Sequence, residues 1–218
     1  MNYNTARLNM VNGQLRPNKV NNTAILAQFA EIPRELFAHP SAKDVAYADM
    51  PLDIGKGRKM LSPLVTARLL QELNPQPSDI ALVLAAGTGY SAAVLSKFVQ
   101  HVYAIEEDKQ LCQNANNTLV DTACGNVTVV EKTPAKGHPS QSPYQIIWID
   151  GLIEYIPIQI IEQLAPNGKI AAVVKGQDDL AEATVYQKKK NTLFAQPQFE
   201  TKELPLIEGF GQGEKFEF

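Results

Sequence analysis

The sequence predicts an α/β fold with a mostly parallel sheet that ends in an antiparallel hairpin, and three observations support this prediction. Short apolar runs alternate with helix-length segments from residue 80 onward. These runs are continuously apolar, as expected for parallel strands that are buried on both faces. The last two runs, in contrast, are separated by a short polar turn. The predicted parallel strands are Ile80–Leu84, Val102–Ile105, Val127–Val130, Ile146–Ile149 and Ile170–Val174.

The two C-terminal runs are Ala183–Gln187 and Thr192–Phe199, and the polar turn Lys188–Asn191 joins them. A crossover between parallel strands needs about twelve residues, so this turn is too short for one. We therefore expect an antiparallel hairpin. A parallel core completed by such a hairpin is typical of the Rossmann-like fold of S-adenosylmethionine-dependent methyltransferases, a likeness that concerns the fold alone.

A mostly helical N-terminal flank precedes this α/β body. The composition changes at the Pro-Gln-Pro segment 75–77. A chain of 218 residues, 44% of them hydrophobic, suffices for one domain with a sizeable core. We expect a single domain over residues 1–218, with the helical flank over 1–75 and the α/β body over 78–218.

Two helix starts can be located in the flank. Asn22 or Thr23 can cap a helix, because a short polar side chain at this position accepts hydrogen bonds from free backbone N–H groups. Ser62 can cap a second helix, since Pro63 already has the φ that a first helical turn requires.

The charge balance argues against nucleic acid as a partner. The chain has 20 basic and 23 acidic residues, a formal net charge of −3, and no basic run longer than Lys188–Lys190 to track phosphates. No window approaches the roughly 18 consecutive apolar residues of a membrane span, and the N-terminus lacks the pattern of a signal peptide. We therefore expect a cytoplasmic protein that binds neither nucleic acid nor a membrane.

The two cysteines, Cys112 and Cys124, lie in or beside one amphipathic segment. They lack the Cys-x-x-Cys or Cys/His spacing that a metal site requires. We expect ordinary core thiols and no metal.

The loop after the first predicted strand is a candidate ligand site. It reads Ala-Ala-Gly-Thr-Gly and opens a helix at the carboxyl edge of the sheet. Glycines allow the backbone to approach a ligand closely, and the helix N-terminus offers free N–H groups to a polar ligand end. The alternative is a tight strand-to-helix turn without a ligand. The predicted cofactor-binding residues of this loop are Ala85, Ala86, Gly87, Thr88 and Gly89.

Glu106 stands 19 positions beyond Gly87, at the tip of the second predicted strand. A carboxylate there can accept hydrogen bonds from both hydroxyls of a ribose, in nicotinamide dinucleotides as in S-adenosylmethionine. The spacing Gly87-x-Gly89-x-x-Ala92 also satisfies the dinucleotide pattern, so this motif alone leaves both cofactors open. Together with Glu106 and the alternating strands, the loop favours a cofactor site.

An ordered series of sequence blocks resembles the protein-L-isoaspartate O-methyltransferase family. The blocks together cover roughly residues 8–175, which makes the resemblance more specific than any single motif. They occupy residues 10–16, 32–37, 46–47, 51–55, 87–95, 102–106 and 164–169.

The resemblance implies an enzyme that transfers the methyl group of S-adenosylmethionine to the carboxylate of an isoaspartyl residue, which starts the repair of damaged proteins. Its partner would be a protein or peptide carboxylate, or an unknown small acceptor. A carboxylate is already a nucleophile and a sulfonium is a good leaving group, so catalysis would come from holding the two in line and excluding water. The oligomeric state is left open.

The chain departs from the family pattern around the predicted cofactor. The family usually has an acidic residue two positions before the first glycine of a G-x-G-x-G run, and here Val83 and Ala85 take these positions. Lys132 and Thr133 replace a Gly-Asp pair that would lie near the adenine. We keep both as further cofactor-side candidates and expect the lysine side chain to point to solvent.

The acceptor side departs as well. The segment Arg58–Pro63 aligns with the family's Gln-Thr-Ile-Ser-x-Pro-like segment, and Leu61 takes the position of the serine. Ser62, one residue away, is either a catalytic candidate or, as we expect, a helix cap. Arg58 and Lys59 either bind an anionic substrate or form a solvated basic loop. The catalytic residues are thus unknown, with Lys59 and Ser62 as candidates.

Asp150 ends the fourth predicted strand at the carboxyl edge, where ligands of such sheets collect. It is a further cofactor-side candidate, and the alternative is a helix cap for the segment that enters at Gly151. Three functions remain open: a methyltransferase, a non-catalytic S-adenosylmethionine-binding or interaction module derived from the same family, and a dinucleotide-dependent oxidoreductase. The long region before the first strand argues against the third.

Overall fold

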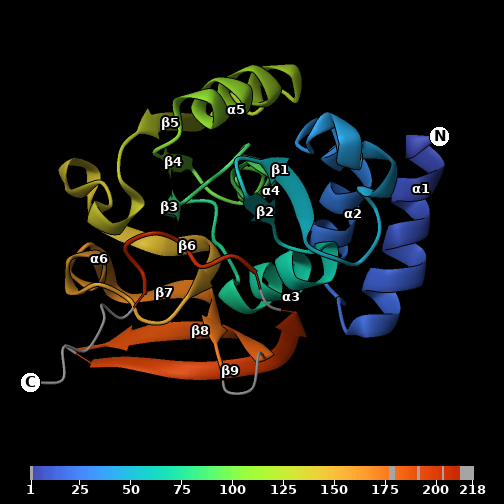
Figure 1. The fold of residues 1–218 in the computed structure, drawn as a ribbon. Helices are drawn as coiled ribbons and strands as arrows, with labels where there is room; N and C mark the ends of the chain where they lie inside the picture. Colours follow the sequence, from blue (N-terminus) through green and yellow to red (C-terminus); the bar gives the residue numbers. More distant parts are fainter. Residues whose placement is uncertain (1, 177–179, 191, 203, 212–218) are drawn as a thin grey trace, which may run out of the picture.

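The computed structural model describes residues 2–176, 180–190, 192–202 and 204–211. A central sheet carries helices on both faces, and the N-terminal helices, coloured blue in Figure 1, form a flank on one side of it. One buried apolar cluster joins this flank to the near face of the sheet, and a second cluster lies on the opposite face under α6.

The helices are mostly short, and several are single turns that link the longer ones. The α-helices are α1 Tyr3–Met10, α2 Thr23–Glu31, α3 Pro63–Leu73, α4 Tyr90–Leu95, α5 Lys109–Asp121 and α6 Ile158–Glu162. The turns are the π-helical Val11–Leu15 and the 3-10 segments Arg16–Asn18, Arg34–Leu36, Pro40–Val45, Pro134–Lys136 and Pro139–Gln141.

The strands form a small two-stranded sheet and a large seven-stranded one. The small sheet contains β1 Leu52–Gly55 and β2 Arg58–Met60. The large sheet contains β3 Ile80–Leu84, β4 His101–Glu106, β5 Val127–Glu131, β6 Tyr144–Ile153, β7 Leu164–Lys175, β8 Leu180–Lys189 and β9 Thr192–Lys202.

The order in the large sheet is β5-β4-β3-β6-β7-β8-β9, so Figure 1 shows β5 at one edge and β9 at the other. The strands from β5 to β7 are parallel, and β8 and β9 are antiparallel. The predicted fold class is therefore confirmed. The strand order runs outward from β3 to β5 on one side and from β6 to β7 on the other, so a topological switch point lies between the parallel strands β3 and β6. Sheets of this kind bind ligands at such a point, at the carboxyl ends of the strands.

Strand β6 is longer than the sequence pattern predicts. It continues through Asp150 and Gly151 to Ile153. Its pairing with β7 is irregular between Trp148 and Leu152 and resumes at the pairs Leu152–Val173 and Ile153–Val174. Asp150 therefore caps no helix, and that alternative is wrong. The physical reason is that β6 is a central strand, whose buried backbone groups are satisfied most directly by further pairing.

The flank is mostly helical, as predicted, but it also contains a β-hairpin that was not predicted. Residues Leu52–Met60 form the hairpin of β1 and β2, joined by Lys56 and Gly57. Both joining residues have positive φ, 57° and 71°, as a two-residue hairpin turn of type I′ requires. The sequence signal was the Gly-Lys-Gly segment, which carries the conformational freedom for this turn.

Both predicted caps are present in the flank. The side chain of Asn22 accepts hydrogen bonds from the backbone N–H groups of Ala24 (3.0 Å) and Ile25 (3.2 Å) at the start of α2. Ser62 Oγ accepts one from the N–H of Val65 (3.4 Å) at the start of α3. The expected capping role of Ser62 is thus confirmed.

Cys112 and Cys124 are free and buried, and burial raises the pKa of the Cys112 thiol to about 11. Within the described ranges, no group of three or more His, Cys, Asp or Glu side chains could hold a metal ion. The described residues also include no helix that is long and apolar enough to cross a membrane.

Replacing the cap tests the role of Ser62. We expect Ser62→Ala to lower the free energy of unfolding by about 1 kcal/mol, because the N–H of Val65 loses its acceptor at the buried start of α3. Urea unfolding measures the change, and Asn22→Ala at α2 is the matched cap variant. An unchanged stability in Ser62→Ala alone would contradict the capping role.

Candidate functional site

The loop Ala85–Gly89 lies at the carboxyl end of β3, beside the point between β3 and β6 where the strand order reverses. Gly87 and Gly89 have φ of 57° and 92°, which L side chains rarely adopt. A Cβ on Gly87 would lie 2.4 Å from Cδ1 of Ile54, so the β1–β2 hairpin packs directly on the loop backbone. The glycine at this position is therefore required by both conformation and space.

Ala85 adopts the same left-handed region, with φ of 57°. For a residue with a Cβ this conformation costs roughly 1–2 kcal/mol. The departure from glycine noted in the sequence is thus a real strain on the loop, and the Ala85 methyl lies buried in the second apolar cluster.

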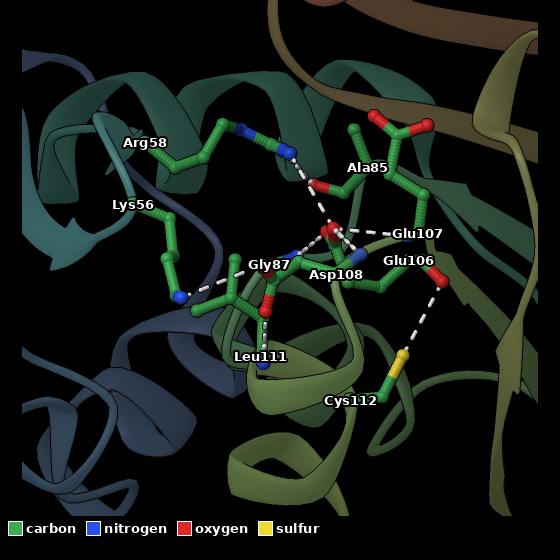
Figure 2. A network of polar contacts seen from close by, with 9 residues as sticks. All are labelled: Lys56, Arg58, Ala85, Gly87, Glu106, Glu107, Asp108, Leu111 and Cys112. Carbon is green, nitrogen blue, oxygen red and sulfur yellow. Dashed lines mark hydrogen bonds and ion pairs between the residues drawn. The ribbon is translucent and has the colours of Figure 1, made fainter.

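Glu106 is the centre of a polar network at the end of β4 (Figure 2), and its side chain is 0% exposed. Its Oε2 accepts a hydrogen bond from the N–H of Gly87 (2.8 Å). Its Oε1 accepts two more, from the N–H groups of Glu107 and Asp108 (both 3.0 Å). Three backbone donors thus fix the carboxylate beside the glycine loop, where the sequence predicted it.

Arg58 completes this network from β2, and its side chain is 19% exposed. Its Nη2 donates to the carbonyl of Ala85 (2.9 Å), and its Nη1 lies 3.5 Å from Oε1 of Glu106. The solvated-loop alternative is therefore wrong for Arg58, although Lys59 is exposed. No local sequence pattern predicts this contact, because Arg58 and Glu106 are 48 residues apart.

The five predicted loop residues do not all face the same way. Thr88 Oγ1 donates to the carbonyl of Phe37 (2.6 Å), so this side chain ties the loop to the flank. Tyr90, the first residue of α4, packs edge-on against Phe29 and Phe37. The flank is therefore a structural part of the site.

Lys132 and Thr133 follow β5 beside Glu106, and both are exposed. The backbone N–H of Lys132 donates to the carbonyl of Glu106 (3.0 Å), but its Nζ lies 3.0 Å from Nδ1 of His138. Burial and the Lys132 charge lower the pKa of His138. The lysine side chain thus turns away from the Glu106 carboxylate.

Asp150 lies on β6 across from the loop, since Leu84 on β3 pairs with the preceding residue, Ile149. Its side chain is buried, and burial raises its pKa from 3.8 to about 6. The nearby Ser91, Trp148, Arg58 and Arg34 oppose this shift. Among the described residues, several buried polar atoms of this region have no hydrogen-bond partner: Arg34 Nη1, Tyr90 OH, Ser91 Oγ, Trp148 Nε1 and Asp150 Oδ1.

Sequence reasoning missed most of the residues around Asp150. Arg34 is fully buried, donating to the carbonyls of Ala46 (2.9 Å) and Leu61 (2.5 Å), with its guanidinium over the ring of Tyr90. Its signal was the Arg-Glu pair within the family-like block 32–37. No sequence pattern predicts which residues surround Asp150 in the fold.

The acceptor-side candidates are not gathered at the loop. Leu61 is buried in the core, and its carbonyl serves Arg34. Ser62, besides capping α3, lines a pocket between α3 and the end of β9. Of the two named catalytic candidates, Lys59 alone lies on the hairpin that covers the loop.

A comparison with protein families decides what kind of chain this is. The family model described as protein-L-isoaspartate(D-aspartate) O-methyltransferase matches residues 6–209. The chain belongs to this family.

Curated relatives of this methyltransferase family agree over most of the chain. The protein-L-isoaspartate O-methyltransferase of Aeropyrum pernix is 37% identical over 190 residues, 85% of this chain and 73% of the relative. That of Gloeobacter violaceus is 32% identical over 197 residues, 90% and 96% of the two chains. The predicted resemblance is therefore confirmed.

Solved structures show the same fold at lower identity. A protein-L-isoaspartate O-methyltransferase aligns with a TM-score of 0.80 at 24% identity, over 94% of this chain and 67% of the other. A Plasmodium falciparum protein described as a protein-L-isoaspartate O-methyltransferase, in complex with S-adenosyl-L-homocysteine, aligns with a TM-score of 0.77 at 16% identity, over 93% and 98%.

The buried charge of Asp150 makes a prediction about stability and pH. Because its pKa is raised in the folded state, the folded chain binds more protons than the unfolded chain between about pH 4 and 6. The charge therefore destabilises the fold above about pH 6, and this cost disappears below about pH 4. At pH 8 we expect the free energy of unfolding of Asp150→Asn to exceed that of the wild type by about 1–3 kcal/mol.

Urea unfolding at pH 8 and pH 4 measures this difference. The matched control is Asp121→Asn, which removes an exposed carboxylate at the end of α5. A gain that is equal at both pH values, or a loss at pH 8, would contradict the assignment.

Proposed function

We propose that this family member uses S-adenosylmethionine to methylate a carboxylate of a protein or peptide, with an isoaspartyl carboxylate as the acceptor that the family name suggests. The observation that carries the proposal is the fixed Glu106 carboxylate beside the glycine loop, at the point where the sheet reverses direction. S-adenosylmethionine supplies an activated methyl group on a sulfonium. The chain itself has to bind, orient and exclude water.

The chain's residues fit this cofactor in three places. Glu106 would accept from the ribose hydroxyls, and the positive-φ glycines Gly87 and Gly89 bring the backbone close to the ligand. Asp150 and the unpartnered polar atoms around it match the charged amino-acid end. Ala85 and Ala86 would line the same end. Lys132 and Thr133, which directly follow β5, would border the adenine.

The hairpin of β1 and β2 is the part of the chain best placed to receive the acceptor. It lies over the loop, through Ile54 on Gly87 and Arg58 on Ala85. Lys59 adds an exposed positive charge on the same strand. A carboxylate acceptor would meet these cations near the end of β3, where arginine can bind it through two parallel hydrogen bonds.

One observation favours a second candidate function, a non-catalytic module that binds the cofactor or another protein. The loop residues are buried, Ala85 is strained, and Arg58 occupies one side of Glu106. A chain that had lost turnover would tolerate such a closed site. Binding and turnover therefore have to be measured on the same sample.

The test is calorimetric titration with S-adenosylmethionine and S-adenosylhomocysteine, followed by a methylation assay on an isoaspartyl peptide. We expect Glu106→Gln to weaken binding of both ligands at least about tenfold, because hydrogen bonds to a charged carboxylate contribute about 1.5–3 kcal/mol. Glu107→Gln is the matched control, since its side chain points away from the network in Figure 2. Circular dichroism and thermal melting verify that each variant is folded.

The outcomes separate the two functions. Binding with turnover of the peptide supports the methyltransferase, and binding without turnover supports the non-catalytic module or another acceptor. If the folded wild-type chain binds neither adenosyl ligand, the proposal of a cofactor site is wrong.

A further inference from the structure

Arg58 holds the glycine loop and the tip of β4 together, as Figure 2 shows. One end of its guanidinium donates to the Ala85 carbonyl, and the other lies beside Oε1 of Glu106. The contact to the carbonyl is 2.9 Å and that to the carboxylate is 3.5 Å. The guanidinium is thus held firmly by the loop and more loosely by the acid.

Glu106 has little remaining capacity for a ligand in this arrangement. A carboxylate has about four lone-pair positions. Three of them face the backbone N–H groups of Gly87, Glu107 and Asp108. The fourth position is on Oε2, whereas the guanidinium lies beside Oε1, which already accepts two of these donors. A ribose that donates from both of its hydroxyls, one to each carboxylate oxygen, would therefore meet Arg58 at Oε1.

Separating the Arg58 guanidinium from Glu106 costs little. A partly buried ion pair at 3.5 Å lies near the limit of a hydrogen bond and stabilises far less than a short bidentate pair. The other ion pair of the hairpin, Lys56 with Asp108 at 3.9 Å, is largely exposed and holds the hairpin tip weakly. Rotation of the Arg58 side chain alone would release Glu106.

A released guanidinium would stand at the end of β3, where the proposed methyl transfer takes place. It would lack the carboxylate that it has in Figure 2, and a guanidinium pairs best with a planar anion of this shape. The proposed acceptor is itself a carboxylate. The same cation therefore has two alternative partners, one before and one after the cofactor binds.

We infer that Arg58 is a positioning residue that passes from Glu106 to the acceptor carboxylate when the ribose of the cofactor takes its place on Glu106. This inference rests on the proposed function and adds an order to it: the cofactor binds first and prepares the site for the acceptor. By linkage, the acceptor tightens cofactor binding by the same factor.

Calorimetry on the full chain tests this coupling. The probes are S-adenosylhomocysteine, an isoaspartyl peptide, and the same peptide with an amide in place of the isoaspartyl carboxyl group. In the wild type we expect the carboxylate peptide to bind at least about tenfold more tightly when S-adenosylhomocysteine is saturating, and the amide peptide to show no such gain.

In Arg58→Gln we expect the gain to disappear, while S-adenosylhomocysteine alone binds about threefold more tightly than to wild type, because it no longer displaces a cation. Lys97→Gln, which removes an exposed positive charge just after α4 and outside the site, should keep both wild-type values. A purely structural role of Arg58 would instead weaken S-adenosylhomocysteine binding in Arg58→Gln.

Each result decides the inference. Equal peptide affinity with and without S-adenosylhomocysteine, or a tenfold gain that survives in Arg58→Gln, would overturn it while leaving the proposed function intact. If the peptide binds neither the free chain nor the chain saturated with S-adenosylhomocysteine, the affinity for S-adenosylhomocysteine alone decides. An affinity that rises less than about twofold in Arg58→Gln would then overturn the inference. Failure of the wild type to bind S-adenosylhomocysteine would instead remove the proposed function.

Discussion

The buried carboxylate of Glu106 is the constraint on which the site depends. A buried charge without partners would cost several kcal/mol, so the backbone around it has to present donors. Gly87 supplies one from the loop after β3, and Glu107 and Asp108 supply two from the start of the next segment. The positive φ of the glycine loop and the entry into α5 are therefore fixed together by a single side chain.

The N-terminal flank belongs to the same arrangement. Thr88 bonds to the carbonyl of Phe37, and Tyr90 packs on the flank's aromatic rings. Arg34 and the β1–β2 hairpin close the remaining sides. Because these contacts cover the strand ends, they bury the loop at the place where the sheet topology puts a ligand. The proposed transfer between a sulfonium and a carboxylate requires such shielding from water.

Much of this could be predicted from the sequence, because its signals are local. Apolar runs gave the strands, glycine spacing gave the loop, and the 19-residue interval to Glu106 gave the acid. The position of Arg58 could not be predicted, since it depends on a hairpin whose strands contact a loop far along the chain. Asp150 was placed correctly at the carboxyl edge, but the continuation of β6 past it follows from pairing with β7.

The departures from the family pattern affect the two halves of the reaction differently. Leu61 in place of a serine removes no nucleophile from the proposed reaction, because the attacking oxygen there belongs to the acceptor carboxylate. The buried leucine supports the core beside Arg34. Ala85 and Val83 instead alter the loop that would hold the cofactor, one through backbone strain and the other through the loss of an acid. Asp150, on the strand next to Val83, brings a buried carboxylate to the same face of the sheet. Cofactor binding, rather than the chemical step, is therefore the property on which catalysis by this chain depends.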